Sequence, residues 1–224
     1  MTTIPTDRFK AKRGSMHAFV FENRNIDLEP TLFYGIDIPL KPFNSGLDYE
    51  SQPVKTSFCF EFIRIPVVDW RRLGGQSFKV AQDDCDGSIH IGDAHNPVDI
   101  NLIRFTRIGN FMFRIDCKLF CDFASEGVAD NARVELSADI KFEGLRVLLD
   151  PAYTEENILE AIEIAARRGK KQALKYVEKV NDVYASERAL EVTSQLVDLT
   201  GYTGPRLEDG KLSFRPRAKG RRAS

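Results

Sequence analysis

A run of strictly alternating residues constrains the fold of this chain more than any other feature of its sequence. From Phe111 to Phe123 every odd position is apolar, while four of the six even positions carry a charge. The segment 133–142 repeats the pattern in the opposite parity, with apolar residues from Val134 to Phe142. A period of two is that of a β-strand with one buried and one solvated face. The two segments therefore predict consecutive strands of an antiparallel sheet that is covered on one side.

Other segments before residue 150 also favour strands, because they are rich in aromatic and β-branched residues. They lie at 16–21, 31–38, 55–65, 77–81 and 98–107. The segment 83–97 is rich in Asp and Gly, so it predicts a loop that holds only a short strand at 89–91. Helical periodicity is missing before residue 150, which argues against helical crossovers and a parallel sheet.

The period changes to that of a helix after Asp150 and Pro151. Thr154 is a suitable N-cap for a first helix. A second helix is predicted from about residue 170, and a third begins near residue 186 unless the second continues. Asp209 and Gly210 predict a hairpin turn within 207–214. The predicted fold class is α+β: an antiparallel sheet or sandwich over residues 15–148, then a C-terminal segment of two or three helices.

These patterns divide the chain into four consecutive parts. Residues 1–14 are polar, and we expect a flexible lead-in. Residues 15–148 form a β-rich domain. Residues 149–214 form a helical region that we expect to dock on the sheet, or whose helices pack on each other, because helices this short are marginal alone. Residues 215–224 are expected to be a disordered basic tail.

The composition favours an intracellular protein. No stretch approaches the roughly 18 apolar residues of a membrane helix, and residues 1–14 lack the apolar core of a signal peptide. We therefore expect no membrane association and a cytoplasmic location, in which the four cysteines stay reduced. Cys59, Cys117 and Cys121 lie within apolar alternation, and we interpret them as small core residues.

An acidic segment that also holds two of the three histidines is the first candidate site. It partly fits a calcium-binding loop, but Gln82 stands where the first carboxylate is required and the flanking residues are strand-like. Imidazole and carboxylate ligands also suit zinc or iron, although a solvated turn uses the same residue types. The predicted metal ligands are Asp84, Asp86, His90, Asp93 and His95.

A Trp-Arg-Arg run in a predicted connection is the second candidate. Trp and Arg dominate the residues that carry binding energy at protein interfaces, and connections present side chains to partners. Trp70, Arg71 and Arg72 are therefore predicted interaction residues. The alternative is that Trp70 closes the edge of the core while the two arginines face water.

The C-terminal tail is the third candidate, because charge is unevenly spread along the chain. The last ten residues carry five cations and no carboxylate, while the other 214 carry 27 cations and 33 carboxylates. Such a tail can neutralise phosphates, but the acidic body repels nucleic acid, which argues against that partner. The residues concerned are Arg215, Arg217, Lys219, Arg221 and Arg222.

No nucleophile elbow, phosphate-binding loop or dinucleotide fingerprint occurs in the sequence. The function predicted first is therefore a non-enzymatic protein that contacts another protein, as an adaptor, a chaperone-like factor or an inhibitor of the immunity-protein type. It requires no cofactor. The alternatives are a metal-dependent enzyme or ligand-binding protein that uses the segment from Asp84 to His95, and a nucleic-acid-associated protein that uses the tail.

Overall fold

The structure is a computed structural model that describes residues 2–23, 26–81, 84–148, 163–164, 166–169, 171–172, 190–208 and 211–218. Its strands and 3₁₀ helices follow one another along the chain. They are η1 (Thr6–Arg8), β1 (Gly14–Asn23), β2 (Leu28–Pro39), β3 (Ser57–Ile63), η3 (Trp70–Arg72), β4 (Ser77–Phe78), β5 (Asp86–Ile91), β6 (Ala94–Arg107), β7 (Met112–Cys121), β8 (Ala132–Leu148), η5 (Leu199–Gly201), β9 (Arg206–Glu208) and β10 (Lys211–Phe214).

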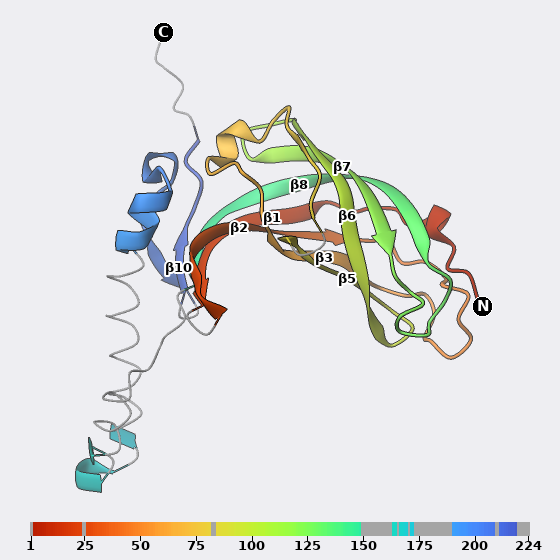
Figure 1. The fold of residues 1–224 in the computed structure, drawn as a ribbon, viewed down its shortest axis with the longest axis horizontal. Helices are drawn as coiled ribbons and strands as arrows, with labels where there is room; N and C mark the ends of the chain where they lie inside the picture. Colours follow the sequence, from red (N-terminus) through yellow and green to blue (C-terminus); the bar gives the residue numbers. More distant parts are fainter. Residues whose placement is uncertain are drawn as a thin grey trace.

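The described strands belong to one sheet that returns to its first strand. Their order is β1-β2-β3-β5-β6-β7-β8-β10-β9, with β4 paired to β6. All of these pairs are antiparallel, but β1 also pairs in parallel with β8 over Gly14–Phe21. Seven strands therefore form a ring, and Figure 1 shows how strongly they arch. The predicted antiparallel sheet is confirmed, while the described residues form no second sheet of a sandwich.

Strand β8 bends at Gly144, where it changes partners along one edge. β7 pairs with β8 as far as Lys141, and β10 pairs with it from Leu145 onward. Gly144 has a φ of 138°, and a Cβ at this position would overlap the carbonyl oxygen of Phe214. On the other edge the register with β1 skips Glu143. This extra residue is a β-bulge, and bulges bend the strand that contains them.

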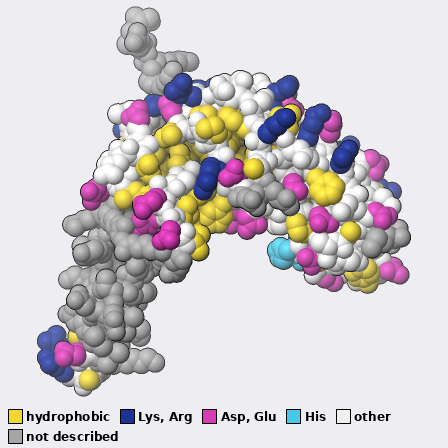
Figure 2. Space-filling model, in the orientation of Figure 1, with side chains coloured by type: hydrophobic (Ala, Val, Ile, Leu, Met, Phe, Trp, Pro, Cys, Tyr) yellow, Lys and Arg dark blue, Asp and Glu magenta, His cyan; other side chains and the backbone are white. Residues whose placement is uncertain are grey.

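Side chains inside the ring form one apolar core, and both ends of the ring are covered. At one end, Ile4 and Phe9 of the N-terminal segment are buried in the core. At the other end, Trp70 and Leu73 from the connection after β3 are buried. The segment 1–14, expected to be a flexible lead-in, thus contributes core residues because it supplies two large apolar side chains. Figure 2 shows apolar side chains near the middle of one face and charged ones along its convex rim.

The C-terminal part of the described chain combines short helices with strands. Residues 163–164, 166–168, 171–172 and 190–196 are α-helical. The predicted hairpin is present, since Glu208 of β9 pairs with Lys211 of β10. In Figure 1 the C-terminal elements lie at one end of the arch and the N-terminus at the other. No described helix combines the length and apolar character that crossing a membrane requires.

Two expectations about single segments are wrong. Residues 83–97 were predicted to be mainly loop, but β5 and β6 form a hairpin there that is closed by Gly92 and Asp93. Asp and Gly in this segment make the turn, while the apolar residues around them build strands. Cys59 was assigned to the core together with Cys117 and Cys121. It is exposed, because its neighbours Phe58 and Phe60 take the inward positions of β3.

The bend at Gly144 generates the first prediction. A Gly144→Ala variant must displace the end of β10 and hold an unfavourable φ, so its free energy of unfolding should fall by about 2 kcal/mol or more. Gly204→Ala is the control, because a Cβ at Gly204 meets open space. It should change the free energy by no more than about 0.5 kcal/mol. Equal denaturant midpoints for the two variants would show that β10 does not approach Gly144 this closely.

Candidate functional site

A groove of about 560 Å³ lies where β8 exchanges β7 for β10. It is lined by Phe111, by residues 141–146 of β8 and by residues 213–216. The ladder with β7 ends at the pair of Met112 with Lys141, after which the amide of Phe142 still donates to the carbonyl of Phe111. The groove thus follows directly from the bend of β8.

Aromatic rings form the apolar wall of the groove. Phe142 and Phe214 are buried, and Phe111 is half-buried. Trp70 supports two of them from the core side, because its ring stacks on Phe142 at 4.9 Å and lies 5.7 Å from Phe111. The guanidinium of Arg107 also lies over the indole ring, 5.6 Å from its centre. Packing against Trp70 therefore holds the rings of Phe111 and Phe142 in place.

Cations outnumber carboxylates among the residues that line the groove. Lys141, Arg146 and Arg215 line it, against the single carboxylate of Glu143. Arg146 pairs with Glu143 at 3.6 Å, and both side chains are about four-tenths exposed. Lys141 is exposed, and none of the described carboxylates forms an ion pair with it. The groove therefore favours a ligand with an apolar part and an acidic part.

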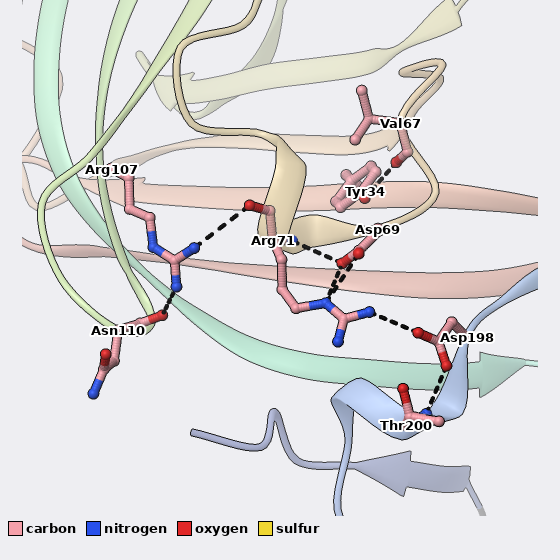
Figure 3. Close-up of polar contacts among 8 residues, drawn as sticks. All are labelled: Tyr34, Val67, Asp69, Arg71, Arg107, Asn110, Asp198 and Thr200. Carbon is pink, nitrogen blue, oxygen red and sulfur yellow. Dashed lines mark hydrogen bonds and ion pairs between the residues drawn. The ribbon is translucent and has the colours of Figure 1, made fainter. Parts of the chain in front are cut away.

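Arg71 joins the covered end of the ring to the C-terminal segment (Figure 3). Its Nε contacts both oxygens of Asp69 at 2.7 and 2.9 Å, and its Nη2 contacts Asp198 at 2.8 Å. Each carboxylate also caps a 3₁₀ helix, Asp69 by accepting from the amide of Arg71 and Asp198 from that of Thr200. The guanidinium packs against Gly201, where a Cβ would lie 3.0 Å from its carbon. This network fixes η5 beside η3.

Two buried tyrosines lie near the same network. The hydroxyl of Tyr34 donates to the carbonyl of Val67 at 2.6 Å. Burial, together with nearby charge, raises the pKa of Tyr34 and Tyr202 far above the ordinary value. Both phenols therefore stay protonated at neutral pH, and neither can serve as a general base.

The three residues of the predicted interaction run take different places. Trp70 is only 2% exposed, as in the alternative that it closes the core. Arg71 is held by Asp69 and Asp198, whereas Arg72 is exposed. Of the three, only Arg72 has an exposed side chain.

The predicted metal ligands lie on the β5–β6 hairpin and just before it. His90 and His95 are paired across the two strands, with ring centres 4.9 Å apart. Asp84 pairs with Arg64 at 3.7 Å, before the hairpin begins. Asp86 begins β5, and Asp93 is in the turn with a φ of 58°. Among the described residues, no three potential ligands converge on one point, so the structure brings together the histidines alone.

The thiols are poor nucleophiles. Burial raises the pKa of Cys117 and Cys121 to about 12, and burial beside Asp86 raises that of Cys85 to about 12. The pKa of the exposed Cys59 is also raised, mainly by its partial desolvation. A thiol with a raised pKa holds almost no thiolate at neutral pH, so this chemistry does not favour cysteine catalysis.

The start of the basic tail is paired with other residues. The carbonyl of Arg215 accepts from the amide of Thr203, and the amide of Arg217 donates to the carbonyl of Gly201. Arg215 also lines the groove. Lys219, Arg221 and Arg222 lie outside the described residues, and the tail as a nucleic-acid site stays a prediction.

Sequence reasoning missed the groove, although a signal for it exists. The buried positions of β8 are even-numbered up to Phe142, and become odd-numbered at Leu145 and Val147. Such a change of parity around Gly144 indicates a bulge. The strand predicted from the sequence ends at residue 142, before this change of parity. Comparison with protein-family models, curated proteins and solved structures found no match to the chain.

A substitution of Trp70 tests whether it is a core residue. Trp70→Ala removes the ring stacked on Phe142, so the free energy of unfolding should fall by about 3–5 kcal/mol. Arg72→Ala, in the same turn, removes an exposed side chain and should change it by at most about 0.5 kcal/mol. Denaturant unfolding followed by circular dichroism measures both. A Trp70→Ala variant as stable as the parent would contradict the packing described above.

The carboxylate of Asp198 makes stability depend on pH. Hydrogen bonds from Thr200 and Arg71 hold the pKa of Asp198 at about 2, below its ordinary value of about 3.9. Because the folded-state pKa is lowered, this stabilisation is full above pH 4 and is lost as the pH falls toward 2. Asp198→Asn should therefore melt below the parent at pH 7, and the difference should shrink between about pH 4 and 2. Glu126→Gln, which removes one exposed carboxylate elsewhere, is the control. A difference in melting temperature that does not change with pH would rule out this role.

Proposed function

We propose that this chain is a non-enzymatic intracellular protein that binds another protein through the groove between β8 and β10. One observation carries the proposal: aromatic side chains and an excess of cations line the same groove at a break in the sheet ladder. Interfaces concentrate their binding energy in a few aromatic and Arg side chains set in such surroundings.

The chemistry of the groove suggests what the partner presents. Phe111 offers a half-buried ring to an apolar side chain. Lys141 and Arg215 are exposed at the groove and attract carboxylates, which increases the rate of association as well as specificity. We expect the partner to contribute a segment that combines an aromatic or aliphatic residue with acidic neighbours.

The rigidity of the site supports binding without large rearrangement. Trp70 backs the aromatic wall, and Arg71 fixes η5 beside η3. A site that is already ordered loses little conformational entropy when it binds. On the same grounds we propose that the C-terminal region as a whole docks on the sheet.

An adaptor, a chaperone-like factor and an inhibitor are the kinds of binding protein that this proposal includes. A cytoplasmic location is likewise part of the proposal. The raised thiol pKa values favour a binding role over cysteine chemistry. Nucleic acid is the less favoured partner, because Arg215 is the only cation in the described part of the tail that lines the groove, and the body carries an excess of carboxylates.

Matched charge reversals test the proposal. Native lysate from the cells that express the chain is passed over the immobilised parent protein and over a Lys141→Glu, Arg215→Glu double variant. We expect a stoichiometric protein to bind the parent and to lose at least about tenfold in affinity for the variant, which is about 1.4 kcal/mol. The control is Lys79→Glu with Arg133→Glu, because both side chains are exposed and lie outside the groove. The control makes the same change in net charge.

Equal loss of the partner from both double variants would indicate attraction by net charge alone. Retention of the partner by the groove variant would place the interface elsewhere. Either result would reject the groove as the binding site.

A further inference from the structure

The β5–β6 hairpin holds His90 and His95 side by side. Gly92 and Asp93 both have positive φ, 68° and 58°, as a two-residue type I′ turn requires. The pair next to the turn is Ile91 with Ala94, followed by His90 with His95. Because the pair that flanks such a turn exchanges hydrogen bonds, the histidine pair occupies a non-hydrogen-bonded position. Side chains at these positions approach most closely.

The two imidazoles are available to a ligand. Their ring centres lie 4.9 Å apart with the planes at 71°, and both residues are exposed. Within the described part of the chain, neither ring takes part in a hydrogen bond or an ion pair. Figure 2 shows histidine side chains at the surface. Two ring nitrogens can therefore turn toward a single ion without breaking another contact.

The hairpin beneath the histidines is fixed by polar contacts. The carboxylate of Glu50 accepts a hydrogen bond from the amide of Gly92 at 2.8 Å. On the inner side, the buried Asn96 donates from Nδ2 to the carbonyls of Ile91 and Ala94 at 2.9 and 3.1 Å. A ligand pair on rigid strands loses little entropy when it binds a metal.

We propose that His90 and His95 form a bidentate site for a divalent transition metal such as Cu²⁺, Ni²⁺ or Zn²⁺. Imidazole suits these ions, and the spacing allows both side chains to bind the same one. The site is open, because no third potential ligand converges on it among the described residues. Water or a ligand from outside the chain completes the coordination, so the metal is exchangeable. The proposal is independent of the groove between β8 and β10.

Metal binding to tag-free protein tests the site. The parent carries Cys59→Ser, because the exposed Cys59 thiol is a competing ligand for copper. Titration with CuCl₂, NiCl₂ and ZnCl₂ in a calorimeter should give one site per chain. His90→Asn and His95→Asn should each weaken binding by at least about tenfold, since each removes one of two ligands. His17→Asn is the control, because His17 is the third histidine and lies on β1, away from the hairpin.

A second measurement locates the metal independently of affinity. Substoichiometric Cu²⁺ should broaden amide signals of residues 88–97 in the NMR spectrum of the parent, and should not do so in the His90→Asn, His95→Asn double variant. Equal affinity of parent and double variant, or broadening centred on another region, would overturn the proposal. Circular dichroism of each variant shows that the fold is kept.

Discussion

The bend of β8 at Gly144 is the constraint on which the rest of the structure depends. One edge of β8 stays paired with β1 along the bend, and this parallel pairing closes the ring. The other edge leaves β7 and accepts β10. Only a residue without a side chain allows β10 to pass this close, because a Cβ would overlap the carbonyl of Phe214. Docking of the C-terminal hairpin on β8 and the groove beside it both follow from this one position.

The C-terminal segment is held to the ring by contacts of two kinds. The main chain of β10 continues the sheet, and Arg71 joins the carboxylates of Asp69 and Asp198, which come from segments far apart in the sequence. Ion pairs that are partly open to solvent, as these are, stabilise little singly. Their value here lies in geometry, since each carboxylate also caps a 3₁₀ helix. The groove consequently has one wall from β8 and another from residues 213–216. Hydrogen bonds of this second wall and of the adjoining Arg217 with Thr203 and Gly201 join it to η5.

The sequence allowed the central strands to be predicted, because the alternation around Ile115 and Leu136 has no helical alternative. It did not allow ring closure to be predicted, since the parallel pairing of β1 with β8 joins residues more than a hundred positions apart and leaves no local pattern. The candidate site residues could likewise be predicted only in part. His90 and His95 were predicted as ligands because their residue type binds metals. The hairpin that pairs them was not predicted, because the Asp and Gly residues of its turn are also typical of a loop. Burial of Trp70 at the edge of the core was one of the two alternatives for this residue. Its contact with Phe142 could not be predicted, because only the fold brings the two rings together.

Amide hydrogen exchange along β8 and β1 tests the central claim most directly. If β8 is shared by three strands, the amides of Leu145 and Val147 should exchange as slowly as those in the middle of β7, and β1 should be protected along its length. The amide of Glu143, at the bulge where β8 changes partners, should exchange markedly faster than its neighbours. Fast exchange throughout β1 and the second half of β8 would show two free edges, and would contradict both the closed ring and the groove that depends on it.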